Sequence, residues 1–112
     1  MILFDKIRGA TDAANKAKIQ QIQNSAAFKN EIIRIAGDED NPDEHPGILM
    51  TKASQGKNCA EKVINTSQPP YTTTTLMFDA VFQYFVSNGF TIRQSTNSQG
   101  SPISNQYDIY WN

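Results

Sequence analysis

The chain has little of what metal centres, disulfides and most active sites require. Its 112 residues include one cysteine, Cys59, and one histidine, His45. A single cysteine excludes an internal disulfide, and a histidine with no second histidine or cysteine near it does not form a zinc site. We therefore expect no metal and no cofactor, and we expect Cys59 to pack as a small apolar side chain.

Charge is also scarce. Charged residues make up 19% of the chain, the formal net charge is −1, and the ten lysines and arginines are scattered singly. Proteins that bind nucleic acid through its phosphates need clustered cations. Nucleic acid is therefore not expected as a partner.

Long hydrophobic runs are missing as well. No segment approaches the roughly 18 apolar residues that a membrane span requires. The opening stretch, MILFDKIRG, is interrupted at Asp5 and is too short for the core of a signal peptide. We therefore expect neither a membrane partner nor secretion by a signal peptide, which leaves the cytoplasm as the default location.

Two segments resemble common ligand-binding motifs but lack residues that those motifs require. In the acidic stretch GDEDNPDEHPG, counting from Asp38 puts Pro42 and Asp43 where a calcium loop needs an oxygen ligand and a glycine. We interpret this stretch as a solvated loop. The segment QGKN lacks the spacing and the hydroxyl of a phosphate-binding loop. We do not expect an enzyme, although an active site assembled between subunits stays open.

The residues that are present are unevenly distributed. Residues 1–65 hold nine of the ten basic and nine of the eleven acidic residues, whereas residues 66–112 hold nine of the eleven aromatic residues. A chain of this length fits one domain with a modest core. We predict a single domain over residues 1–112, with a charged helical part and an aromatic helix-hairpin part that supplies most of the core.

Helical patterning runs from Thr11 to Ala36. Thr11 can cap the start, and Gly37 can end the helix because glycine takes left-handed conformations without steric cost. A break at Ser25, itself a good cap, would divide the segment, so one helix and two helices both stay open. A seam of small residues would let another helix approach closely, either within the chain or from a second copy: Ala10, Ala14 and Ala17.

The middle of the chain is ambiguous. Residues 48–51 could form a short strand, and residues 60–65 either a short helix or a strand, because periodicity cannot separate the two at that length. A two-stranded hairpin is marginal alone. We therefore expect a third strand from residues 1–4, from residues 48–51 or from another copy of the chain.

The segment LMFDAVFQYFV predicts the central helix, over about residues 74–88. The four threonines at 72–75 can each cap its start, and its polar residues form one narrow stripe. A helix that is apolar on most sides must be covered on most sides. We therefore expect Phe82 and Phe85 to be buried at the middle of the protein.

A turn at Asn88-Gly89 should end this helix, with Phe90 folding back onto Phe85. Two alternating segments then predict an antiparallel hairpin, with strands at about 90–96 and 106–111. Together with the helices, this hairpin places the chain in the α+β class.

The C-terminal stretch resembles the ends of small uncharacterised proteins of tailed bacteriophages. The resemblance is carried by Gly89 to Gln94, after an apolar helix, and by Tyr107 to Trp111, after a polar loop. These residues include no catalytic group, so the resemblance supplies no site. It implies a phage-encoded protein that resides in the host cytoplasm or in the virion.

Low charge, many amide and hydroxyl side chains and an aromatic hairpin are typical of wet protein interfaces. We therefore expect a non-catalytic structural or interaction protein that forms a homo-oligomer or a larger assembly. The expected contact residues are Tyr107, Tyr110, Trp111 and Arg93, although Tyr107 and Trp111 could serve the core alone. The alternative is a winged-helix-like nucleic-acid-binding regulator, because a helix followed by a hairpin is the order of that fold. The absence of lysine and arginine from residues 74–88 disfavours it.

Overall fold

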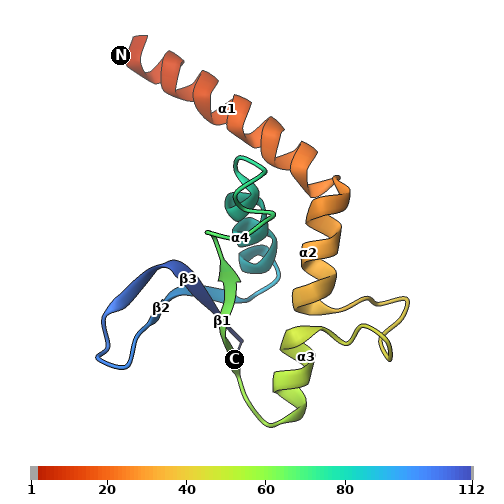
Figure 1. Cartoon of the computed structure of the whole chain (residues 1–112). Helices are drawn as coiled ribbons and strands as arrows, with labels where there is room; N and C mark the ends of the chain where they lie inside the picture. The colour runs from red at the N-terminus through yellow and green to blue at the C-terminus, as the bar shows by residue number, and fades with distance from the viewer. Residues whose placement is uncertain (1–2, 112) are drawn as a thin grey trace.

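The computed structural model describes residues 3–111 of the chain. This part forms a small α+β domain, as predicted (Figure 1). In chain order the elements are the helices and strands α1 (Leu3–Gln23), α2 (Ala26–Ala36), α3 (Gly47–Ser54), β1 (Cys59–Asn65), α4 (Met77–Ser87), β2 (Thr91–Thr96) and β3 (Pro102–Tyr110).

The three strands form one antiparallel sheet in the order β1-β3-β2. Ile109 on the middle strand pairs with Ala60 on one side and with Ile92 on the other. The third strand is therefore β1, one of the two structures left open for residues 60–65. Residues 48–51 form part of α3, so their prediction as a strand is wrong. Of residues 1–4, the first two lie outside the described residues and the other two belong to α1.

The error at residues 48–51 has a simple cause. Apolar runs of four residues fit a strand and a buried helix turn equally well. In the structure Leu49 is buried, whereas its neighbour Met50 is 58% exposed. α3 thus has one covered side, which packs against α2 and β1.

The N-terminal helix begins at Leu3, not at Thr11. The Thr11 hydroxyl donates a hydrogen bond to the Ile7 carbonyl within the helix and so caps nothing. The chain does break near Ser25, whose Oγ accepts a hydrogen bond from the Phe28 amide and caps α2. Gly37 ends α2 with φ at 91°, as predicted.

The helix α4 packs against the sheet, and its end follows the prediction closely. Gly89 has φ at 90°, the Phe90 amide donates to the Phe85 carbonyl at 3.0 Å, and the two rings meet edge to face at 5.5 Å. Its start is different. The predicted threonine cap is wrong, because Leu76, in a left-handed conformation, precedes the helix and no side chain caps it.

Phe85 is fully buried, and the core around it includes the large side chains Ile35, Ile64, Met77 and Ile109. The expectation for Phe82 is wrong, because this side chain is 37% exposed and Val86 is 45% exposed. Both belong to the side of α4 that also carries the predicted polar stripe. The uncovered side is thus wider than the polar residues alone indicated.

The C-terminal hairpin is present, although β3 starts four residues earlier than expected. Its face towards the core is the predicted one: Ile109 is fully buried, and Tyr107 and Trp111 pack at the edge of the core.

Candidate interaction surfaces

The most unusual feature of the molecule is the free part of α1. Leu3 and every residue from Asp5 to Lys18 are exposed, and burial begins only at Ile19. From there the helix packs on α4, where the Gln23 side-chain amide donates to the Ala80 carbonyl at 3.2 Å. Figure 1 shows the helix extending away from the rest of the protein. We call residues 3–18 the arm.

One face of the arm carries a continuous row of apolar side chains. They are spaced alternately four and three residues apart, the spacing of a helix that packs along another helix. Leu3 is 72% exposed and Ile7 is 59% exposed. We call this set the arm row: Leu3, Ile7, Ala10, Ala14 and Ala17.

By helical periodicity the arm row lies nearly opposite Ile19, the residue that turns towards the core. No other described part of the chain covers it. The seam of alanines predicted from the sequence is therefore exposed, and no part of the chain that the structure describes covers it. Its contact with a second copy stays a prediction.

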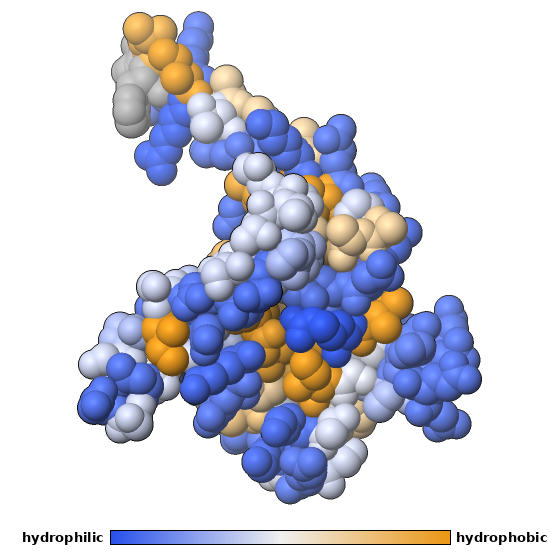
Figure 2. All heavy atoms as spheres, viewed as in Figure 1, coloured by the Kyte–Doolittle hydropathy of each residue, from blue (hydrophilic) through white to orange (hydrophobic). Residues whose placement is uncertain are grey.

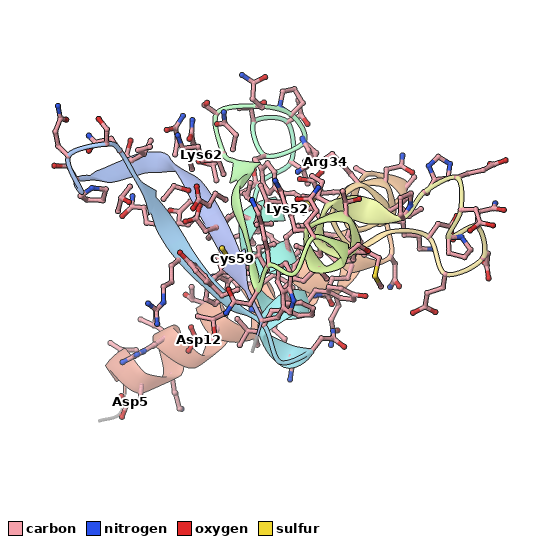
Figure 3. The ribbon with its side chains drawn as sticks, turned by 90° about the horizontal axis from the view of Figure 1, so that it is seen from below. Asp5, Asp12, Arg34, Lys52, Cys59 and Lys62 are labelled. Atoms are coloured by element: carbon pink, nitrogen blue, oxygen red, sulfur yellow. The ribbon has the colours of Figure 1, made fainter. Side chains whose placement is uncertain are left out.

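Basic and acidic side chains lie on different sides of the arm. Lys6 and Lys18 flank the arm row, whereas Asp5 and Asp12 lie on the far side of the helix by the same periodicity. Figure 3 shows both acids on α1, away from the sheet. The face that carries the arm row is therefore bordered by positive charge.

A second exposed feature is a groove of about 440 Å³ beside α2. Apolar side chains of α2 contribute its floor, and the loop after α2 contributes a rim of carboxylates. We call it the acidic groove; its lining is Phe28, Lys29, Ile32, Ile33, Ala36, Gly37, Asp38, Glu39, Asp40 and Tyr84.

The loop that carries this rim is well ordered. Its ends are joined by a hydrogen bond from the Asp38 amide to the His45 carbonyl, and the His45 amide donates to the Asn41 carbonyl, both at 2.9 Å. Gly37 and Gly47 let the two ends pass in contact, since a Cβ at Gly37 would lie 2.5 Å from the Pro46 carbonyl oxygen. The acidic rim is thus held in place before any partner arrives.

The four predicted contact residues fall on opposite faces of the sheet. Tyr107 stacks on Phe78 at 4.6 Å and Trp111 meets Phe90 at 6.4 Å, both at the edge of the core. On the other face the Arg93 guanidinium lies 5.7 Å from the centre of the Tyr110 ring. The structure therefore brings Arg93 and Tyr110 together, whereas Tyr107 and Trp111 each contact another ring of the core. The role of all four residues in partner binding stays a prediction.

The face that carries Arg93 and Tyr110 also holds a buried carboxylate that the sequence did not reveal. Asp108 is 7% exposed, and its Oδ1 accepts hydrogen bonds from the Lys62 amide at 2.8 Å and from the Ser95 hydroxyl. Lys62 has φ at 55°, in a bulge of β1. Partial burial and then the Asp108 charge raise the pKa of Tyr110. The carboxylate stabilises the bulge, and its only signal in the sequence was a lone acid in an aromatic strand.

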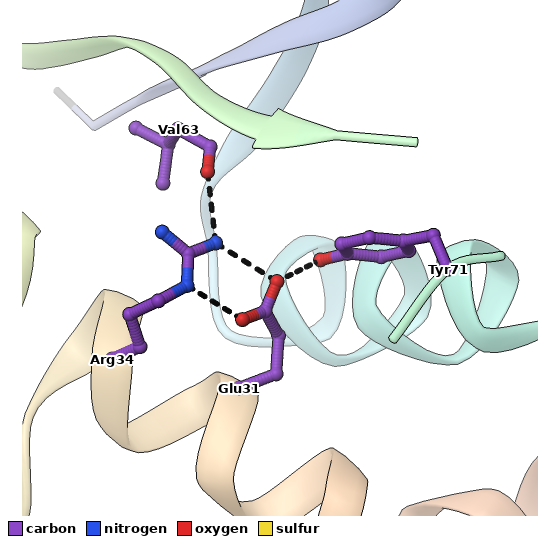
Figure 4. A network of polar contacts seen from close by, with 4 residues as sticks. All are labelled: Glu31, Arg34, Val63 and Tyr71. Carbon is purple, nitrogen blue, oxygen red and sulfur yellow. Dashed lines mark hydrogen bonds and ion pairs between the residues drawn. The ribbon is translucent and has the colours of Figure 1, made fainter. Parts of the chain in front are cut away.

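A second buried carboxylate joins α2, β1 and the segment before α4 (Figure 4). Glu31 accepts two hydrogen bonds from Arg34, at 2.6 and 2.8 Å, and one from the Tyr71 hydroxyl. Arg34 also donates to the Val63 carbonyl at 2.9 Å. The hydrogen bond with Glu31 raises the pKa of Arg34, and burial, followed by that same carboxylate, raises the pKa of Tyr71 well above its usual range.

The network connects three segments of the chain, so it stabilises the packing of α2 against β1 and against the segment before α4. The pair Glu31 and Arg34, three residues apart on a helix, was visible in the sequence. The contribution of Tyr71 was not, because forty positions separate it from Glu31.

Within residues 3–111 no three histidine, cysteine or acidic side chains are placed to hold a metal ion. In the same range no helix combines the length and the apolar character needed to span a bilayer. Cys59 is half-buried, less than expected, and lines a small hollow with Lys52, Lys57 and Glu61 near the centre of Figure 3.

The arm row and the acidic groove are thus two exposed features of the described residues that a partner could contact. No protein family, curated protein or solved structure matches the chain.

Proposed function

We propose that the protein is a non-catalytic structural or interaction protein that acts by self-association, with the arm as its contact element. The observation that carries this proposal is the uncovered arm row. Burying a side chain such as Leu3 or Ile7 is worth about 1.5–3 kcal/mol. An exposed amphipathic helix that buries neither is typical of a protein whose partner is missing.

The composition of the arm row favours a helix or a groove of a protein as the partner. Three of its five members are alanines, which allow close approach of backbones but offer little apolar area to a lipid surface. An isolated helix of this length is also marginal in water. Contact with a partner would therefore stabilise the helical form of the arm as well as bury its apolar face.

We place this activity in a bacteriophage, in the virion or in the host cytoplasm during its assembly. The support is the resemblance of Gly89 to Gln94 and Tyr107 to Trp111 to the ends of small proteins of tailed phages. The second of these segments forms the C-terminal part of the middle strand of the sheet.

Light scattering over a range of protein concentrations tests the proposal. The wild type should show a molar mass above that of one chain, and Ile7→Glu should reduce it to a monomer. Lys16→Gln is the matched control, because it changes the charge of the arm by the same amount on the far side from the arm row. A wild type that is monomeric at every concentration would overturn the proposal.

A second candidate, a winged-helix-like nucleic-acid binder, is favoured by one observation. The order α4, β2, β3, with β1 completing a three-stranded sheet, gives the helix-then-hairpin arrangement. The exposed side of α4 argues against it, since this side carries Asp79 and no lysine or arginine. Binding to duplex DNA that weakens steeply with added salt would support this candidate over self-association.

A further inference from the structure

We infer that the arm of one copy docks in the acidic groove of the next copy, so that copies join head to tail. The inference rests on the proposed self-association and adds to it the identity of the receiving surface.

The two surfaces lie on different parts of the molecule. The arm ends far from the sheet, and the loop that carries the acidic rim lies on the opposite side of the protein from that end (Figure 1). On the face shown in Figure 2, apolar side chains gather at the free end of the arm with nothing described above them. α1 is continuous through Gln23, so the arm cannot fold back into its own groove without breaking the helix.

Charge complementarity favours the acidic groove, and not a second arm, as the surface that receives the arm. The arm carries four basic and two acidic residues, and both acids point away from the arm row. The loop over residues 38–44 carries five acidic residues and no lysine or arginine. Pairing two arms along their rows would place Lys6 and Lys18 of both copies beside one seam, which is unfavourable, whereas the rim of the groove attracts the same lysines.

The shapes of the two surfaces also agree. An amphipathic helix that lays its apolar face into a groove is a common mode of recognition. The floor of the groove is apolar through Phe28, Ile32 and Ala36, and its carboxylates stand along one side. The one base in the lining, Lys29, lies two turns of α2 away from that rim.

Such a contact is heterologous, because two different surfaces of the same chain meet. Each added copy leaves one arm and one groove free, so the assembly grows into an open chain or closes into a ring.

Two variants with complementary defects test this geometry. The arm variant is Ile7→Glu. The groove variant is Glu39→Lys with Asp40→Lys, which reverses two exposed rim charges and leaves Asp38, which orders the loop, in place. The matched control is Asp43→Lys with Glu44→Lys, an equal charge change in the same loop outside the acidic groove.

Each variant alone should be monomeric by light scattering, and the control should associate like the wild type. An equimolar mixture of the arm variant and the groove variant should give a discrete complex of two chains, because only one functional arm and one functional groove meet. Adding Lys6→Glu and Lys18→Glu to the groove variant should restore association.

The outcomes separate the inference from the proposed function. If the groove variant associates like the wild type while the arm variant does not, the arm binds elsewhere and head-to-tail docking is wrong, although self-association stands. A control that loses association as fully as the groove variant also overturns the inference. A monomeric wild type overturns both.

Discussion

Removing Arg34 should destabilise the fold more than removing Glu31, although the two side chains share one ion pair. Their surroundings differ: the Glu31 side chain is 4% exposed, whereas that of Arg34 is 45% exposed. In the variant Arg34→Met, Glu31 stays buried and retains one donor, the Tyr71 hydroxyl. In Glu31→Met, the guanidinium of Arg34 can turn to water and can still donate to the Val63 carbonyl.

The magnitudes follow from these exposures. Leaving one partner of a buried ion pair behind costs about 3–5 kcal/mol, and water near Arg34 puts the expected loss for Arg34→Met at the lower end, about 3 kcal/mol. In Glu31→Met, losing the ion pair with the exposed arginine lowers the free energy of unfolding by only about 0–1 kcal/mol. The unpaired Tyr71 hydroxyl adds roughly 1 kcal/mol, so the total is about 1–2 kcal/mol.

Urea denaturation, followed by the fluorescence of Trp111, gives the free energies of unfolding. All variants should carry Ile7→Glu, so that association does not raise their apparent stability. The double variant Glu31→Met with Arg34→Met is the decisive control. It should be more stable than Arg34→Met alone, because it removes the buried charge that the single substitution leaves behind.

Two results would refute this reasoning. One is a loss for Glu31→Met equal to or larger than the loss for Arg34→Met. The other is a double variant less stable than Arg34→Met, which would mean that Glu31 retains adequate partners without the arginine.

Three further predictions concern the core, the alkaline limit of stability and the bulge. Phe85→Ala should lower the free energy of unfolding by about 3–5 kcal/mol, and Phe82→Ala by roughly 1 kcal/mol, because only the first ring is fully buried. The pKa of Tyr71 is raised in the folded state, so its stabilising effect is complete below the ordinary tyrosine pKa of about 10 and is lost as the pH rises above it. Tyr71→Phe should flatten that alkaline loss. Asp108→Ala should cost about 2–3 kcal/mol, since it leaves an amide and a hydroxyl without an acceptor, and should speed amide exchange in β1.

Urea titrations and hydrogen exchange check these three predictions. Equal losses for the two phenylalanine variants would contradict the position of α4 against the sheet. An alkaline slope that persists unchanged in Tyr71→Phe would exclude Tyr71 as its source. Unchanged exchange in the Asp108 variant would show that the bulge is held by other contacts.

Local signals predicted local structure well. The cap at Ser25, the end of α2 at Gly37 and the return of Phe90 onto Phe85 each depend on residues within a few positions of one another. The hairpin was likewise predictable, since its strands alternate, although the connection between them is shorter than the predicted residues 97–105 because β3 begins at Pro102.

The errors concern which surfaces are covered. Whether Phe82 is buried depends on where the sheet and α1 lie against α4, and no local pattern contains that information. The same holds for β1, whose partner strand follows some forty positions later. The buried contact between Glu31 and Tyr71 crosses a similar distance.

The arm shows the limit of local patterns most clearly, because its helix was partly predicted while its partner was not. The last turns of α1 determine which side of the helix faces the core, because Ile19 and Gln23 pack inward there. Since the alanine row lies nearly opposite, the rigid continuation of the helix carries it away from the protein. The same geometry that holds α1 to α4 therefore leaves Leu3 and Ile7 exposed. In the proposed assembly, association supplies the contacts that an isolated helix of this length lacks, so the helicity of the arm should rise with protein concentration in the wild type and stay constant in Ile7→Glu.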